Sequence, residues 1–395
     1  MSEEIIDLSC IEESPPKPLP SLPTVPPSLI LSPEQDQALH TILEWSKQRL
    51  QKEFKLGGYA GTGKTTLVKT LLKELKLLQH RVIVCAFTGK AVHVLQKKGI
   101  TAQTLHSLMY NVEVDPKTGE VSFYRRDFLE SSPTLIIVDE ASMISTDLYY
   151  DLKSFGKLLL FVGDPGQLEP VGDNPNLMLS PDFVLQTIHR QAQNSPIITL
   201  ATKVRQGGKI DYCKSEALNV LTKGATDIGA AVKADQLLCA TNKVRNNMNN
   251  SIRSHLGLRG YITPGEKLIV LKNNLQFGVF NGMLVWVEDI LETKPKYWVV
   301  NVRDEVDRKI RLNIWREPFE NPLLKDKPGD PPKDETGKLK CVHADYGYVI
   351  TCHKSQGSEW DHVMVFDQYL GAIWDMKRWR YTAITRAAKQ LTYYI

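Results

Sequence analysis

The sequence predicts an α/β protein whose parallel strands are covered by helices on both faces. Short runs dominated by aliphatic residues, at 134–138 and 158–162, alternate with segments of helical periodicity such as 66–77. Strands of parallel sheets are continuously apolar because helices bury both of their faces. A second series of the same kind begins near residue 181. We therefore expect two α/β units in this chain of 395 residues.

The elements of the first unit can be placed in order. Ser32 and Gln35 form a capping box ahead of an apolar helical pattern, so the first helix should start there and run to about residue 50. After it we expect a strand at 54–56, a helix at 66–77, a strand at 81–87, a helix at 90–97 and the two aliphatic strands.

Two β-rich insertions interrupt this alternation. Between 110 and 126, apolar residues alternate around a D-P-K-T-G turn, which predicts a β-hairpin. Between 267 and 312, short runs of β-branched and aromatic residues predict a small all-β module. The expected boundaries are a tail at 1–28, a first unit at 29–180 with its hairpin at about 110–126, a second unit at 181–258 and 342–395, and a β module at 259–341 with a polar loop at 325–340.

The tail differs in composition from the rest of the chain. Residues 1–28 hold seven of the 22 prolines and five acids against one base. Such a segment cannot bury enough apolar surface to fold, so we expect it to be disordered. Its Pro23–Pro26 stretch fits P-x-x-P, and residues 5–8, which lie among acids, resemble a short docking peptide for a protein partner. A solvated tail without a partner is the alternative.

Composition restricts the class of protein. Charged residues make up 24% and hydrophobic residues 42%, and no apolar run approaches the ~18 residues needed to span a bilayer. The six cysteines include no C-x-x-C pair and lie mostly in apolar runs, which indicates small reduced core residues. We expect a soluble, cytoplasmic protein with no membrane contact. The net charge is +4, and because the tail carries −4 the rest of the chain carries +8, which is compatible with a polyanionic partner.

A phosphate-binding loop follows the first predicted strand. Residues 58–65 fit G-x-x-x-x-G-K-[ST], and the predicted strand before them and helix after them are the setting of that loop. Gly58, Gly61 and Gly63 let the backbone approach phosphate oxygens. Lys64 can reach the β- and γ-phosphates, and the Thr65 hydroxyl can bind Mg²⁺. The sequence therefore predicts a nucleoside triphosphate site.

Polar residues after the two aliphatic strands complete that site. Asp139 and Glu140 end the first of them, where a carboxylate can bind Mg²⁺ and a second can activate the attacking water. Gln167 leaves the next strand in a Gly-Asp-Pro turn and can contact both a γ-phosphate and a water. Because ligands bind at the carboxyl ends of parallel strands, we expect these side chains to converge.

Taken together, the phosphate loop, D-E-A-S at 139–142 and G-D-P-x-Q-L-x-P-V at 163–171 resemble the B branch of the superfamily-1 helicases, the RecD/Dda-like group, with the Pif1 helicases more distant. The resemblance extends from residue 35 to residue 386. It implies two RecA-like domains in tandem, a strand-separating pin in the inserted hairpin, and a small SH3-like β-barrel in the second domain. It also implies ATP and Mg²⁺ as cofactors and a place in DNA replication or repair.

The resemblance assigns the ATP site residue by residue. Gln35 corresponds to the contact with adenine, and Arg190 and Arg386 correspond to arginines that reach the γ-phosphate from the second domain. The implied catalytic residues are Lys64, Glu140, Gln167, Arg190 and Arg386. The implied nucleotide contacts are Gln35, Gly58, Gly61, Thr62, Gly63, Lys64, Thr65, Thr66, Gln356, Gly357 and Glu359, and the metal ligands are Thr65 and Asp139.

Contacts with nucleic acid follow from the same resemblance. The implied residues are Thr88, Gly89, Lys90, His106, Phe123, Tyr124, Thr351, His353 and Lys354. Either Phe123 or Tyr124 of the hairpin is expected to stack on the first unpaired base. The chain departs from the family at Phe87 and at Glu169, where proline is usual. The first departure puts the local backbone and base stacking in doubt, and we expect the second to be tolerated.

The expected function is that of a monomeric ATP-dependent DNA helicase that moves 5′ to 3′ on single-stranded DNA and opens forked duplexes. The polarity rests on the resemblance alone. An RNA helicase and a nucleic-acid-stimulated ATPase that loads or remodels without unwinding remain alternatives. A small-molecule kinase is disfavoured because it has no need of paired arginines in a second domain.

Overall fold

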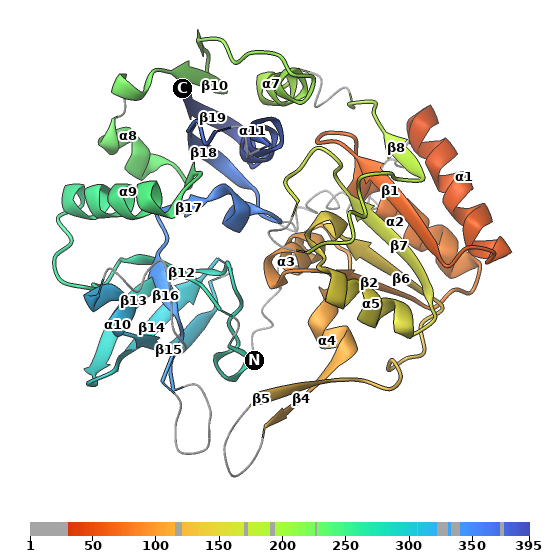
Figure 1. Ribbon diagram of the computed structural model, residues 1–395, viewed down its shortest axis with the longest axis horizontal. Helices are drawn as coiled ribbons and strands as arrows, with labels where there is room; N and C mark the ends of the chain where they lie inside the picture. Colours follow the sequence, from red (N-terminus) through yellow and green to blue (C-terminus); the bar gives the residue numbers. More distant parts are fainter. Residues whose placement is uncertain are drawn as a thin grey trace, which may run out of the picture.

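The computed structural model describes residues 31–114, 121–169, 173–189, 194–225, 227–272, 274–305, 307–321, 331–332, 340–371 and 375–395. The tail at 1–28, Arg190 and most of the loop at 325–340 lie outside these residues. Two α/β units lie side by side, and a smaller sheet lies next to the second of them (Figure 1).

The first unit is a parallel sheet of six strands in the order β3-β2-β6-β7-β1-β8. Its strands are β1 (Glu53–Gly58), β2 (Val82–Ala86), β3 (Gln103–Thr104), β6 (Leu135–Asp139), β7 (Leu158–Gly163) and β8 (Phe183–Leu185). Its helices are α1 (Pro33–Gln48), α2 (Lys64–Leu77), α3 (Gly89–Lys97), α4 (Leu105–Met109), η1 (Ala141–Met143) and α5 (Thr146–Ser154). The predicted α/β class with a parallel sheet is confirmed.

Alternate residues of β6 explain why the sequence shows an unbroken apolar run there. Leu135 and Ile137 pack into the core beneath α1 and α2, whereas Ile136 and Val138 pack into the core on the other face. All four side chains are fully buried. The strand therefore needs apolar residues at every position, and its polar residues appear only where it ends.

The inserted hairpin consists of β4 (Tyr110–Val114) and β5 (Val121–Arg125), paired antiparallel. It continues directly from α4 and projects away from the first sheet (Figure 1). Its base is fixed by a hydrogen bond from the Tyr110 hydroxyl to Asp151 of α5 and by one from the Arg126 amide to the Met109 carbonyl at 2.8 Å. The turn at 115–120 lies outside the described residues.

The second unit is a six-stranded sheet in the order β17-β11-β18-β19-β10-β9, in which only β9 runs antiparallel to its neighbour. Its strands are β9 (Cys213–Lys214), β10 (Leu218–Leu221), β11 (Gln236–Cys239), β17 (Val349–Thr351), β18 (Trp360–Phe366) and β19 (Ala387–Tyr394). Its helices are α7 (Pro196–Arg205), η2 (Lys223–Ala225), α8 (Ile228–Lys233), α9 (Asn242–His255), η5 (Cys352–Ser355) and α11 (Met376–Ile384).

The smaller sheet is antiparallel, in the order β15-β14-β13-β12-β16. It comprises β12 (Lys267–Val270), β13 (Leu284–Thr293), β14 (Tyr297–Asp304), β15 (Lys309–Trp315) and β16 (Ala344–Tyr346), with η3 (Leu275–Phe277) and α10 (Glu317–Glu320). Residues of β14 alternate strictly between partly exposed and buried, so the sheet has one core face. That face forms a hydrophobic cluster of its own.

Helix α9 joins the smaller sheet to the second unit. The side-chain Nδ2 of Asn249 donates to the carbonyls of Tyr346 and Val349 at 3.3 and 3.0 Å. Its Oδ1 accepts the backbone amide of Val349 at 2.9 Å. Arg245 pairs with Asp345 at 3.0 Å, and both side chains are buried. The chain thus crosses between the two sheets twice, near residue 260 and at 347–348, with polar contacts at the second crossing.

Strand pairing corrects two of the expected boundaries. β8 pairs in parallel with β1, so the first unit extends beyond residue 180 to at least Leu185. β16 pairs with β12, so the smaller sheet extends beyond residue 341. Short apolar strands carry no signal for the sheet they join, because sequence periodicity reports burial and not the pairing partner.

Two compositional expectations can be examined in the described residues. Cys85, Cys213, Cys239, Cys341 and Cys352 are free thiols there, and all except Cys213 are buried. Across the described ranges, every helix is too short or too polar to cross a membrane.

Candidate ATP site and nucleic-acid track

The phosphate loop joins β1 to α2 at the carboxyl edge of the first sheet. Gly61 and Gly63 have φ angles of 79° and 75°, in the left-handed region that favours glycine. A Cβ on Gly58 would lie 2.8 Å from the Lys64 side chain, so glycine makes room for the lysine. The Lys64 ammonium donates to the Gly58 carbonyl at 2.6 Å and to the Tyr59 carbonyl at 3.3 Å. Amides of the first α2 turn, which includes Thr65 and Thr66, can bind an anion here.

Two side chains hold the top of the loop from outside. Gln35 is 1% exposed, and its amide donates to the carbonyls of Thr62 and Gly63 at 3.2 and 3.3 Å. Its Oε1 accepts the Ser32 amide at 3.0 Å, which completes the predicted capping box. His189 Nε2 lies 3.1 Å from the Thr62 carbonyl. Gln35 thus orders the loop backbone in this structure, and its assignment to adenine stays a prediction. His189 was not anticipated, although it stands beside Arg190.

The acid pair ends β6 where the sequence placed it. Glu140 has a φ of 53°, unusual for a residue with a side chain, and its amide donates to Asp139 Oδ1 at 3.0 Å. Burial raises the pKa of both carboxyls, and the charge of Asp139 raises the pKa of Glu140 further. Lys64 opposes both shifts. Asp139 is partly buried, and its carboxylate is the kind of oxygen ligand that Mg²⁺ prefers.

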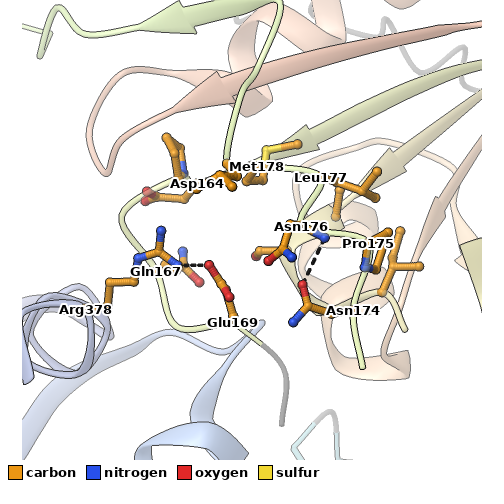
Figure 2. A pocket seen from close by; sticks show the side chains of 14 residues that line it. Asp164, Gln167, Glu169, Asn174, Pro175, Asn176, Leu177, Met178 and Arg378 are labelled. Atoms are coloured by element: carbon orange, nitrogen blue, oxygen red, sulfur yellow. Dashed lines mark hydrogen bonds and ion pairs between the residues drawn. The ribbon is translucent and has the colours of Figure 1, made fainter. Parts of the chain in front are cut away.

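Asp164 and Gln167 follow β7 on the same edge. Asp164 is 1% exposed, and its Oδ2 lies 4.0 Å from the Lys64 ammonium. Gln167 is also buried, and its Oε1 has no hydrogen-bond partner among the described residues. Both side chains line a small pocket completed by Glu169, the segment 174–179 and Arg378 of α11 (Figure 2). A buried acceptor without a donor fits the predicted contact of Gln167 with a water or phosphate.

Of the two arginines predicted to reach the γ-phosphate, the described residues include Arg386. Arg386 is buried and donates to the carbonyls of Thr382 and Ser358 at 3.1 and 2.9 Å. Its charge lowers the pKa of Glu140 against the effect of burial, so it lies within electrostatic reach of the acid pair. Arg190 lies outside the described residues.

Segments of all three sheets meet at the predicted nucleic-acid track. Thr88 caps α3 by accepting the Ala91 amide at 3.1 Å, and a Cβ on Gly357 would lie 3.2 Å from its hydroxyl. A Cβ on Gly89 would lie 3.0 Å from the Phe280 ring. Gln356 is buried and donates to the Leu168 carbonyl at 2.7 Å. Residues of the second unit therefore contact the first unit at both the track and the ATP site.

Lys90 has the most notable environment on this track. Its ammonium pairs with Glu305 of the smaller sheet at 2.8 Å and lies 4.2 Å from the centre of the Trp360 ring. Burial lowers the pKa of Lys90, and the Glu305 carboxylate opposes that shift. Neither Glu305 nor Trp360 was predicted, because contacts between units leave no spacing signal in the sequence.

The remaining residues predicted to contact nucleic acid or nucleotide have varied surroundings. The Lys354 ammonium donates to Asn281 at 2.8 Å, and Thr351 precedes η5. Burial lowers the pKa of both His106 and His353. Tyr124 on the hairpin is 52% exposed, while the Phe123 side chain lies outside the description. Glu359 is exposed, and no hydrogen bond or ion pair within the described part of the chain joins it to the ATP site.

The two departures from the family pattern both have structural partners. The Phe87 ring lies 6.1 Å from His106, which in turn lies 5.8 Å from Tyr110. Glu169 forms an ion pair with Arg378 of α11 (Figure 2). The residue at 169 therefore adds a contact between the units that a proline could not make.

Comparison with known families places the chain. The model described as "AAA domain" matches residues 30–234, just over half of the chain, and the model described as "UvrD-like helicase C-terminal domain" matches residues 346–393. The chain belongs to superfamily 1B of the helicases. In this superfamily 1B member, the first matched region covers the first α/β unit and continues into the second as far as residue 234. The second matched region lies in the second unit.

Curated relatives of this superfamily 1B member are longer proteins. It is 30% identical over 366 residues to the ATP-dependent RecD2 DNA helicase of Deinococcus radiodurans, covering 84% of this chain and 45% of the relative. It is 30% identical over 205 residues to the ATP-dependent DNA helicase dda of Enterobacteria phage T4, covering 47% and 44%. The chain thus spans less than half the length of these relatives.

Solved Pif1 helicases share the fold. The Candida albicans enzyme matches with a TM-score of 0.52 and 19% identity over 93% of this chain and 94% of its own. The Bacteroides enzyme, in complex with ADP-AlF3 and ssDNA, matches with a TM-score of 0.54 and 19% identity over 92% of both chains. At this identity the likeness concerns the fold alone.

Proposed function

We propose that this chain is an ATP-dependent DNA helicase that moves 5′ to 3′ along single-stranded DNA and separates forked duplexes. The observation that carries the proposal is the contact of α11 with the phosphate loop and with Asp164, which joins the second unit to the ATP site of the first. The track residues Lys90 and Lys354 come from the same two units. A change in the distance between the units would therefore be felt at both sites.

The residues of the site suit hydrolysis of a nucleoside triphosphate. Loop amides and Lys64 bind the β- and γ-phosphates, and Thr65 and Asp139 hold Mg²⁺. When bound, the metal neutralises charge on the phosphate oxygens. Glu140 in its ionised form accepts a proton from the attacking water, which Gln167 orients. Arg386 and Arg190 then stabilise the charge of the transition state, a contribution that is typically about 10³–10⁵ in rate.

The track suits a single strand that lies between the units. Lys90 and Lys354 lie on opposite units, and their present partners, Glu305 and Asn281, offer oxygen atoms where phosphate oxygens would bind. The aromatic rings of Trp360 and Tyr124 can stack on bases. The hairpin would act as the separating pin, and the smaller antiparallel sheet as an SH3-like module that closes over the strand. Both relatives named above are DNA helicases, which favours DNA over RNA.

The test is ATP hydrolysis and strand separation by the purified chain. We expect oligothymidylate to accelerate hydrolysis strongly and RNA of equal length to do so less. Forked duplexes should open when they carry only a 5′ tail, and not when they carry only a 3′ tail. Lys64→Ala should abolish both activities, whereas Lys73→Ala, an exposed lysine on the same helix, should leave both intact. Hydrolysis at one rate with and without polynucleotide would refute the proposal.

A further inference from the structure

Tyr381 of α11 connects the second unit to the phosphate loop through its hydroxyl group. The side chain is 1% exposed. Its oxygen accepts the Ala60 amide of the loop at 2.8 Å and donates to Asp164 Oδ2, also at 2.8 Å. A single hydroxyl thus joins three segments that are far apart in sequence: the loop, the turn after β7 and α11.

The Asp164 carboxylate extends this contact to Lys64. Oδ2 lies 4.0 Å from the Lys64 ammonium, and Oδ1 accepts the Gly166 amide at 2.8 Å. Burial, and then the charge of Asp164, raise the pKa of Tyr381 well above its usual range, so the hydroxyl keeps its proton and remains a donor. The orientation of the carboxylate that faces the catalytic lysine is therefore set by a residue of the other unit.

The residues around Tyr381 pack closely against it. A Cβ on Gly166 would lie 2.9 Å from the Tyr381 ring, so only glycine lets the ring approach this closely. The adjacent Thr382 hydroxyl accepts the Leu168 amide at 2.8 Å. The Arg205 guanidinium of α7 also lies 3.5 Å from the centre of the Tyr59 ring in the loop. Two helices of the second unit therefore contact the loop.

We propose that Tyr381 is a positioning residue for ATP hydrolysis. Its hydroxyl holds the Asp164 carboxylate and the Ala60 amide at fixed positions relative to Lys64. A movement of α11 with the second unit changes these positions. Binding of a strand between the units is thereby transmitted to the phosphate loop. This inference rests on the proposed function, because it explains how polynucleotide accelerates hydrolysis.

Tyr381→Phe tests the inference because it removes the hydroxyl and keeps the ring. We expect kcat at saturating oligothymidylate to fall about tenfold, since small misplacements in a catalytic site have effects of this size or larger. The KM for ATP should change less than about twofold, because the amides and Lys64 that bind the phosphates remain. Tyr393→Phe is equally buried in the core of the second unit, and among the described residues its hydroxyl forms no hydrogen bond with the loop, so it should keep the wild-type kcat.

A double-mutant cycle with Asp164→Asn separates positioning from a general loss of structure. If Tyr381 acts through Asp164, the kcat of the double variant should be no lower than that of the less active single variant. Multiplication of the two losses would overturn the inference, as would a wild-type kcat in Tyr381→Phe. If thermal unfolding shows that Tyr381→Phe is not folded, Gly166→Ala provides a second variant, because it displaces the same ring. An unchanged kcat in Gly166→Ala would also overturn the inference.

The proposed function can fail separately from this inference. If oligothymidylate does not stimulate the wild-type chain, the proposed function is wrong. If the wild type responds and both Tyr381→Phe and Gly166→Ala respond equally, only the role of Tyr381 is wrong.

Discussion

Replacing Glu305 with glutamine should strengthen the binding of single-stranded DNA. In the structure the Glu305 carboxylate holds the Lys90 ammonium at 2.8 Å, on the residue where the strand is proposed to bind. A phosphate and this carboxylate would compete for the same cation. Glutamine keeps the shape of the side chain and removes the charge.

The magnitude follows from the burial of the pair. The Lys90 side chain is 15% exposed and that of Glu305 is 25% exposed, so the pair is neither a surface pair nor a fully desolvated one. The cost of desolvation offsets most of its Coulomb energy, and a net value of about 1 kcal/mol is reasonable. A strand that no longer has to break this pair gains the same amount, which corresponds to about fivefold tighter binding.

The assay is fluorescence anisotropy with labelled oligothymidylate at one fixed salt concentration, because phosphate contacts make affinity depend on salt. Glu288→Gln is the matched control. Its side chain is 24% exposed and pairs at 2.5 Å with Arg303 within the smaller sheet, not with Lys90. The control should bind like the wild type. Equal or weaker binding by Glu305→Gln would refute competition between the carboxylate and the strand.

Three further predictions concern the other parts of the site. Glu140→Gln should abolish turnover and raise the thermal midpoint by about 2 °C at neutral pH. Because burial raises the pKa of Glu140, the folded wild type loses stability as pH rises above the ordinary value of 4.5, so this gain should shrink toward acid pH in thermal scans. Deleting 112–123 should abolish strand separation in a forked-duplex assay while stimulated ATP hydrolysis persists; loss of both would contradict a pin. Arg378→Ala should lower stimulated kcat about twofold to fivefold, since it breaks an ion pair with Glu169 between the units, and Glu169→Ala should match it in the same assay.

Local motifs were readable from the sequence, and contacts between units were not. The phosphate loop, the acid pair and the capping box each lie within one short segment, where glycine geometry, hydrogen bonding and strand ends impose fixed spacing. Gln35 shows the limit: its place in the capping box was predicted, but its bonds to Thr62 and Gly63 depend on tertiary packing. The partner of Lys90 could not be predicted, because Glu305 lies in a turn of a different sheet.

Residues 347–348 form a short connection between the smaller sheet and the second unit. Only these two residues separate β16 of that sheet from β17 of the second unit, and Asn249 bonds to the backbone on both sides of them. Because this connection is short and braced on both sides, we expect the smaller sheet to move together with the second unit. A tilt of α11 against the phosphate loop should then be accompanied by a movement of Glu305, whose pair with Lys90 lies at the same end of the smaller sheet as this joint.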